Sequence, residues 1–192
     1  MNRLHIAVAA VLCAVLSLTA CATPAAPPTS GSASHDSHSA HSLSDSKAPF
    51  DAQFIDAMIV HHEGAVAMAG EARTQAAKPE LKALADAVLT SQSAEIEQMK
   101  AWRKSWYPDL PPTTGMQMDM GPINVAPGDA PYDVRFIDAM IPHHEGAIAM
   151  AEEALKKSER SEIKALAQAI IKSQSEEIER MKQWRAAWSP TP

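Results

Sequence analysis

Apolar residues recur at helical spacing in four separate stretches of the chain. In the first, from Asp51 to about Gln75, a rotation of about 100° per residue places one set on a single face: Phe54, Ile55, Met58, Ile59, His62, Ala65, Val66 and Ala69. A second helix is predicted from Glu80 to about Trp106, directly after Pro79, because proline favours the first turn of a helix. The same spacing predicts helices from Asp133 to about Lys157 and from Ser161 to Trp188.

The third and fourth helices repeat the first and second. Shifted by 82 positions, residues 54–106 align without a gap on residues 136–188, and 33 of the 53 aligned positions are identical. The most conspicuous difference is Pro142, which stands where the first repeat has Val60. Proline inside a helix removes a backbone hydrogen bond, at a cost of about 3 kcal/mol in an unadapted setting. We therefore expect a kink in the third helix beside His143.

The two repeats predict one all-α domain, spanning residues 50–189. A lone helical hairpin has one apolar face and nothing to bury it against. The 26 residues from Tyr107 to Tyr132 include six prolines and are expected to form a linker. At ~3.3 Å per residue it could span a helix of roughly 40 Å. We expect a ferritin-like four-helix bundle of two duplicated hairpins, residues 51–106 and 133–188, joined by a long crossover.

The N-terminal residues predict export and attachment to a lipid. Arg3 and the apolar run from Ile6 to Leu18 are typical of a signal peptide, and Leu18-Thr19-Ala20-Cys21 resembles a bacterial lipobox. The resemblance implies removal of residues 1–20 and acylation of Cys21, and an ordinary secretory signal cut nearby is the alternative. Cys13 would leave with the signal, so no internal disulfide is expected. In the first case the protein is anchored to the bacterial membrane, in the periplasm or at the cell surface.

Residues 21–49 are rich in Ser, Ala and Pro, a composition that predicts a disordered tether. Within it, His35, His38 and His41 could bind a metal ion weakly or simply belong to a solvated polar tail. The chain has a formal net charge of −6 and no basic cluster, so nucleic acid is a poor candidate for a partner. Its acidity instead raises the local concentration of cations.

The helices and the linker carry residues that bind soft metal ions. Methionine sulfur favours Cu(I), and imidazole accepts Cu(I), Cu(II) and zinc. Methionines and histidines stand at i, i+3, i+4 and i+10 along the first helix and recur in the third. Three further methionines, at positions 116, 118 and 120, alternate in the linker, where no helical spacing places them in a core. The alternative is that the helix methionines are ordinary core residues and that the buried histidines are merely hydrogen-bonded.

The polar residues of the helices argue against a di-iron centre. Such centres in ferritin-like bundles use Glu and Glu-x-x-His motifs, but Met58 and Ile59 stand three residues before His61 and His62. Glu95 and Glu177 are the only carboxylates expected to point inward. Gln92 is expected on the apolar face of the second helix, where the histidines of the first helix could satisfy its amide. Gly64 is expected to mark a close approach by a neighbouring helix.

The pattern F-I-x-x-M-I-x-H-H-x-x-A-x-x-M-A, followed by Q-x-x-E-I-x-x-M-x-x-W, is similar to the family named domain of unknown function three hundred and five. The resemblance covers about Phe50 to Trp188. It implies an exported bacterial protein of ferritin-like fold, in a family with some members that bind copper and support copper tolerance. It also implies candidate ligands in both repeats: Met58, His61, His62, Met68 and Met99, with Met140, His143, His144, Met150 and Met181 as counterparts.

The favoured hypothesis is a non-enzymatic copper-binding lipoprotein that buffers, scavenges or transfers copper outside the cytoplasm. Cu(I) is the expected ion, with Cu(II) as the second candidate, and a copper-transfer protein is a candidate partner. The linker methionines Met116, Met118 and Met120 are included among the expected ligands. One alternative is a metal-dependent redox enzyme acting on Cu(I), although the sequence lacks the clustered histidines or Cys-His centre that oxidases normally use. Another is a structural helical module at the cell surface.

Overall fold

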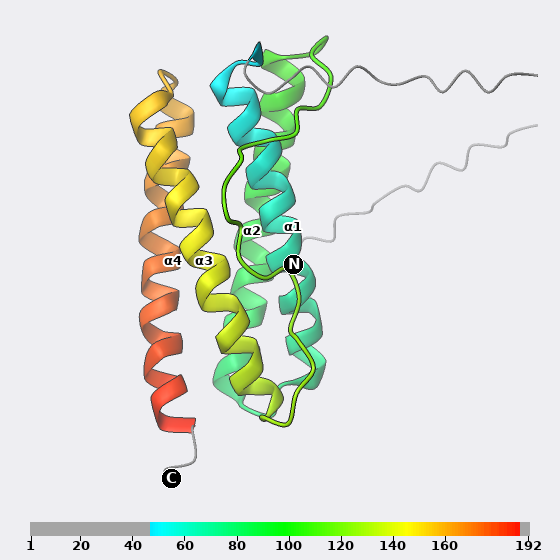
Figure 1. Cartoon of the computed structure of the whole chain (residues 1–192), viewed down its shortest axis with the longest axis vertical. Helices are drawn as coiled ribbons and strands as arrows, with labels where there is room; N and C mark the ends of the chain where they lie inside the picture. The colour runs from blue at the N-terminus through cyan, green and yellow to red at the C-terminus, as the bar shows by residue number, and fades with distance from the viewer. Residues whose placement is uncertain (1–46, 189–192) are drawn as a thin grey trace, which may run out of the picture. The chain divides into compact units, whose positions relative to one another are not determined.

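The computed structural model describes residues 47–188, so the predicted signal peptide, Cys21, His35, His38 and His41 lie outside the described residues. Within this range the chain forms four α-helices and no strand: α1 (Phe50–Gln75), α2 (Pro79–Trp106), α3 (Tyr132–Lys157) and α4 (Ser161–Trp188) (Figure 1). The all-α prediction is confirmed, and each helix begins and ends within one residue of its predicted bounds. None of these four helices is long and apolar enough to cross a membrane.

Two antiparallel hairpins make up the bundle. Helix α1 packs along α2 and α3 along α4, while the two hairpins meet chiefly through α1 and α3. The connection leaves the end of α2, passes in front of α1 and α3, and reaches the opposite end of the bundle before α3 begins (Figure 1). Residues 107–131 therefore form the long crossover of a ferritin-like bundle, as the sequence predicts.

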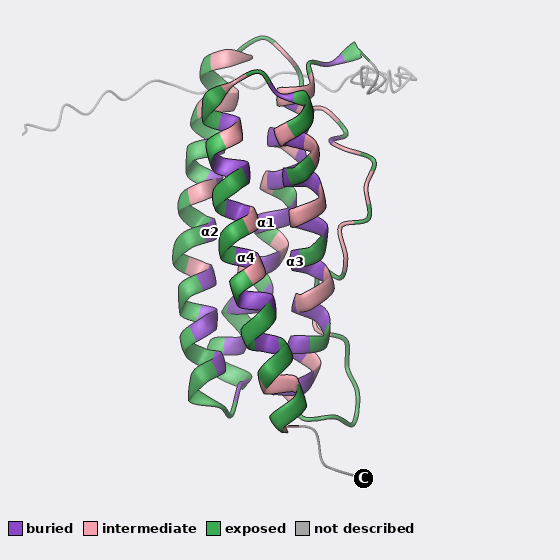
Figure 2. Ribbon diagram, turned by 90° about the vertical axis from the view of Figure 1, so that its left-hand side faces the viewer, coloured by how far each residue is buried: buried purple, intermediate pink, exposed green. Residues whose placement is uncertain are grey.

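Buried residues line the inward faces of all four helices (Figure 2). They form two apolar clusters, and each cluster combines residues from both repeats. The first cluster includes three methionines from three helices: Met68, Met140 and Met181. The second includes their three repeat counterparts: Met150, Met58 and Met99. Because neither cluster is complete within one hairpin, the hydrophobic stabilisation of each repeat depends on the other.

Contacts at the two ends of the bundle also join the repeats. The carboxylate of Asp133, in the first turn of α3, accepts hydrogen bonds from the backbone N–H groups of Ala77 and Lys78 at 3.1 and 2.8 Å. These two residues lie in the turn between α1 and α2. Arg160, in the turn between α3 and α4, lies 4.1 Å from the centroid of the Trp106 ring. Asp133 is only 5% exposed, so the expectation that Glu95 and Glu177 are the only inward carboxylates is wrong.

The crossover lies close against α3 at glycine positions. Gly121 has a φ of 66°, and a Cβ at this residue would lie 2.7 Å from the Pro142 carbonyl oxygen and 2.8 Å from the His143 Cα. Within α3, a Cβ on Gly146 would lie 3.1 Å from the carbonyl carbon of Met120. Helix α3 continues through Pro142 from end to end. The linker backbone therefore rests directly on α3 beside the histidines.

Gly64 of α1 also faces this contact region. A Cβ there would lie 3.4 Å from His143 Cε1 and 3.4 Å from Ile123 Cγ2. The close approach expected at Gly64 is therefore made by a neighbouring helix, α3, through the side chain of His143. The linker makes a second close approach through Ile123. Sequence periodicity alone did not indicate the linker, because its position depends on tertiary packing.

Candidate metal centre

Four histidines form a polar layer across the middle of the bundle. His61 and His62 lie on α1 between Met58 of the second cluster and Met68 of the first, and His143 and His144 occupy the matching positions on α3. We call these four residues the central layer. All four are 0% exposed. The apolar face predicted for the first helix does not include His61, but α3 packs on that side of α1 and buries this residue completely.

The first histidine of each pair meets its counterpart across the α1–α3 contact. The rings of His61 and His143 are stacked, with centroids 3.8 Å apart and an interplanar angle of 19°. His143 Nε2 donates a hydrogen bond to the backbone carbonyl of His61 at 3.2 Å. Burial, together with neighbouring imidazoles, lowers the pKa of His61 to about 2 and that of His143 to about 4. Both rings are therefore neutral at neutral pH, the form in which imidazole binds a metal.

The second histidine of each pair is held by a carboxylate from its own hairpin. His62 Nε2 lies 2.7 Å from Glu95 Oε2, and His144 Nε2 lies 2.7 Å from Glu177 Oε2. An ionised carboxylate only accepts hydrogen bonds, so Nε2 of each ring carries a proton, and in the neutral form of an imidazole bound in this way Nδ1 keeps a lone pair. Metal-binding histidines are commonly oriented by a carboxylate in this way. The sequence suggested Gln92 as the hydrogen-bond partner of the first-helix histidines, but in the structure the partner of His62 is Glu95.

Several polar atoms of this region are buried without a hydrogen-bond partner from the protein. They are both ring nitrogens of His61, the Nδ1 atoms of His62, His143 and His144, and the side-chain oxygens of Gln92 and Gln174. A buried polar atom without a partner costs about 1–3 kcal/mol. Imidazole nitrogens that retain a lone pair in a buried site are suited to a metal ion. The donor chemistry of the central layer therefore fits metal binding.

Methionines from both repeats flank the central layer along the helices. Among residues 47–188, no three side chains of the His, Cys, Asp and Glu types are placed to hold one metal ion together. Two of the predicted thioether ligands lie next to the histidines along the helices, because Met58 and Met140 each precede a histidine pair by one helical turn. These and the other four helix methionines are at most 1% exposed: Met68, Met99, Met150 and Met181. Neutral sulfur and imidazole donors together suit a soft ion such as Cu(I).

The three predicted linker methionines are half-buried, and they contact different parts of the bundle. Met116 and Met118 pack against the second cluster and line a surface pocket of about 320 Å³ with Phe50 and Glu153. The backbone of Met120 reaches α3 at Gly146, one turn from His143. The predicted ligands therefore fall into three groups: the central layer, the buried helix methionines that flank it, and the linker methionines.

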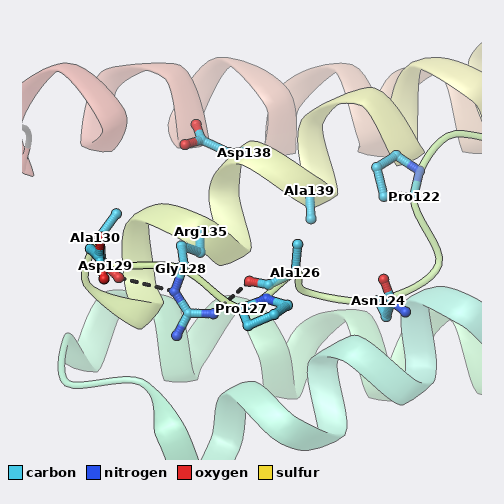
Figure 3. A pocket seen from close by; sticks show the side chains of 10 residues that line it. All are labelled: Pro122, Asn124, Ala126, Pro127, Gly128, Asp129, Ala130, Arg135, Asp138 and Ala139. Atoms are coloured by element: carbon cyan, nitrogen blue, oxygen red, sulfur yellow. Dashed lines mark hydrogen bonds between the residues drawn. The ribbon is translucent and has the colours of Figure 1, made fainter.

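A second pocket, of about 370 Å³, lies between the end of the linker and α3 (Figure 3). Its lining contains neither histidine nor methionine. Arg135 donates hydrogen bonds to the carbonyl oxygens of Ala126 and Ala130, at 2.6 and 2.9 Å, from beside this pocket. These bonds attach the linker to α3, and the pocket is separate from the candidate metal centre.

Solved structures with known ligands resemble this chain. CopM in its Cu(I)-bound form is 40% identical, with a TM-score of 0.63, over 72% of this chain and 96% of that chain. CopM in its Cu(II)-bound form matches with the same identity and TM-score over 72% of this chain and 98% of that chain. A protein described as secreted, from Streptomyces coelicolor, is 27% identical, with a TM-score of 0.61, over 72% of this chain and 92% of that chain.

Comparison with protein families gives the same relationship. The model of the family described as Domain of unknown function (DUF305) matches three overlapping segments, residues 22–103, 51–127 and 108–185. None of the curated protein sequences compared with the chain is a significant match. The chain is therefore a member of the DUF305 family.

Proposed function

We propose that this protein is an exported copper-binding protein that buffers, scavenges or transfers copper. The observation that carries the proposal is the central layer: four fully buried histidines with unpartnered ring nitrogens, bordered by methionines from both repeats. The resemblance to CopM supports it, because structures of that protein are described as Cu(I)-bound, Cu(II)-bound and Ag-bound. Silver(I) and Cu(I) are both soft ions, and thioether and imidazole groups are suitable ligands for both.

Each group of donors has a distinct part in the proposal. His62 and His144 bind copper through Nδ1, and Glu95 and Glu177 hold their rings in the required tautomer. His61 and His143 supply further nitrogens. Thioether sulfur comes from the helix methionines that flank the layer: Met58, Met68, Met99, Met140, Met150 and Met181. Because thioether sulfur carries no proton to lose, and the lowered pKa values keep His61 and His143 neutral, these donors stay available in mildly acidic surroundings.

The linker methionines provide a second, weaker site in the proposal. Met116 and Met118 are half-buried on an irregular segment, so binding must order side chains that the core leaves partly free. The buried donors sit on helices fixed by packing and should hold copper more tightly. Met116, Met118 and Met120 would then bind copper that exchanges quickly, as acquisition from or transfer to a partner protein requires. Acylation of Cys21 would keep this exchange at a membrane, outside the cytoplasm.

Copper titration under reducing conditions, in competition with a Cu(I) chelator, tests the proposal. We expect the combined change His62→Ala and His144→Ala to remove high-affinity copper and to leave the helix content largely intact by circular dichroism. Replacing Met116, Met118 and Met120 with leucine should remove only weaker copper. The matched control is Glu63→Gln with Glu145→Gln, which alters the exposed neighbours of the same histidines.

Two results would contradict the proposal. If zinc binds as tightly as Cu(I), the thioethers are not ligands and copper is not the favoured ion. If the linker variant loses the tightest copper and the histidine variant loses none, the central layer is only part of the core. Metal analysis of the protein purified from copper-supplemented cells shows which metal it binds in the cell.

A further inference from the structure

The central layer is enclosed on three of the four sides of the bundle. Within the hairpins, α1 packs along α2 and α3 along α4, and α1 also packs against α3. The linker covers the α1–α3 side, where Gly121 rests on Pro142 and His143 and the backbone of Met120 rests on Gly146. An ion approaching from that side would have to displace the linker.

The fourth side, between α2 and α4, is more open. These two helices are not among the pairs whose backbones run close together over the described residues. A cleft of about 420 Å³ lies between them, lined by Glu95 and Trp102 of α2 and by Glu162 and Ala169 of α4. Its lining thus includes two carboxylates and an indole, which are groups that attract cations.

Glu95 connects this cleft to the buried histidines. Its side chain is 21% exposed, while its Oε2 lies 2.7 Å from Nε2 of the fully buried His62. The counterpart in the second repeat, Glu177, makes the same contact with His144 but is only 10% exposed. In the first repeat, the side chain of Glu95 therefore reaches from the cleft to the central layer, whereas Glu177 is less exposed and is not in the lining of this cleft.

We propose that the cleft between α2 and α4 is the port through which copper enters and leaves the central layer, with Glu95 as the last carboxylate before His62. This inference rests on the proposed function. Entry through the port is an exchange of ligands without change of oxidation state. The carboxylates of Glu162 and Glu95 attract the ion, the ring of Trp102 offers a cation–π surface, and the buried imidazoles then bind it.

A matched pair of variants tests the port by its rate. Ala169→Phe adds a bulky side chain to the cleft, and Ala87→Phe makes the same change at the counterpart position on α2, which is not in the lining of this cleft. We measure binding of Ag(I), as a stable substitute for Cu(I), by stopped-flow tryptophan fluorescence. Ala169→Phe should slow loading by about tenfold, equivalent to a barrier about 1.4 kcal/mol higher, with unchanged stoichiometry. Ala87→Phe should load at the unaltered rate. Equal rates in all three proteins, or equal slowing by both variants, would overturn the port.

A metal-free measurement separates this inference from the proposed function. In the ¹⁵N-labelled protein, the Nε2 proton of His62 should exchange with solvent faster than that of His144, because Glu95 is the more exposed carboxylate. Ala169→Phe should slow the exchange at His62, and Ala87→Phe should not. If this pattern appears while no copper or silver binds, the route exists and the proposed function is wrong. If the two protons exchange equally and neither variant changes them, the port is wrong even in a protein that binds copper.

Discussion

The two repeats share most of their side chains, but the same pairs of residues lie in different surroundings. In the first repeat, Arg103 Nε lies 2.8 Å from Asp56 Oδ1, and these side chains are 14% and 15% exposed. In the second repeat, the corresponding atoms of Arg185 and Asp138 lie 2.6 Å apart, with exposures of 39% and 50%. The ion pair is conserved between repeats, while its burial is not.

The linker accounts for this difference. Arg103 also donates hydrogen bonds to the carbonyl oxygens of Tyr107, Leu110 and Pro111, and Asp56 accepts one from the backbone N–H of Thr113. The first repeat therefore uses its ion pair to hold the start of the crossover. Duplication therefore gives both repeats the same helix faces and the same ion pair. Because there is only one linker, the ion pair of the first repeat binds it and that of the second repeat stays exposed.

A second contrast concerns the residue before each histidine pair. Val60 is 59% exposed on α1, whereas Pro142 at the same position of α3 is half-buried and lies beside Gly121. The linker rests on α3 at this point. Pro142 lacks an N–H group, and its carbonyl oxygen faces the linker backbone. The predicted kink site thus coincides with the place where the linker covers the central layer.

The largest effect is expected when the repeats are separated. Residues 51–106 alone should form no stable folded monomer, because both apolar clusters need side chains from the other repeat. The isolated hairpin should be unfolded or should pair with a second copy. Thermal unfolding followed by circular dichroism, with mass determined by light scattering, checks this. A cooperatively folded monomer would show that one repeat is sufficient.

The next effect is a loss of stability in acid. The pKa values of His61 and His143 are lowered to about 2 and about 4, so in the metal-free protein the unfolded chain binds protons that the folded chain does not. The free energy of unfolding should therefore fall as pH drops below about 6.5, by roughly 1.4 kcal/mol per pH unit for each histidine. The window ends near pH 4 for His143 and extends lower for His61. Urea unfolding from pH 7 to pH 5 measures the slope, and His61→Gln and His143→Gln should each reduce it. If neither variant changes the slope, these two histidines are not the source of the acid sensitivity.

The ion pairs provide a direct comparison of the repeats. Arg103→Ala should lower the free energy of unfolding by about 2 kcal/mol, because it removes a largely buried, charge-assisted pair and three bonds to the linker. Arg185→Ala should lower it by less, because the pair of Arg185 with Asp138 is solvent-exposed and screened by water. Urea unfolding of both variants gives the difference. Equal losses would mean that the linker contacts add nothing to the first pair.

The sequence predicted the elements that depend on local pattern. Helix bounds and the inward position of His62 follow from 3.6-residue periodicity, and the duplication predicted that both hairpins belong to one bundle. The position of the linker could not be predicted, because Gly121 meets Pro142 only through tertiary packing across 21 positions of chain. The same limit applies to His61, whose burial requires α3. The contact of the Asp133 carboxylate with the turn between α1 and α2 was also not predicted, because it joins residues 55 and 56 positions apart in the chain.

The choice of partner within the candidate site depends on three-dimensional geometry in the same way. Gln92 and Glu95 are three residues apart on α2, so both lie near the same face and either could meet His62. The carboxylate makes the contact, at 2.7 Å, while the Gln92 side-chain oxygen has no hydrogen-bond partner. Which imidazole nitrogen remains available follows from that contact and could not be obtained from spacing alone.

The smallest expected effect is a difference in stability between alanine variants of Gly64 and Gly146, the two helix glycines that face the linker. Replacing glycine by alanine inside a helix stabilises it by up to about 1 kcal/mol when the new methyl group has room. Gly70→Ala gives this reference, because a Cβ there has nothing within 4 Å. At Gly64 the Cβ would meet only side-chain atoms, at 3.4 Å and beyond, so Gly64→Ala should also be stabilising. At Gly146 it would meet backbone atoms of Asp119 and Met120 at 3.0–3.2 Å, and the linker must shift to accept it.

Gly146→Ala should therefore lose the helical gain and destabilise the protein by roughly 1 kcal/mol, because displacing packed backbone is more costly than moving a side chain. Urea unfolding of the three single variants, under one buffer condition, resolves differences of this size when the dependence on denaturant is unchanged. The expected order of stability is Gly70→Ala and Gly64→Ala above the unaltered protein, with Gly146→Ala below it. If Gly146→Ala is as stabilising as Gly70→Ala, the linker does not press on α3, and the asymmetry between the repeats must come from the ion pair of the first repeat alone.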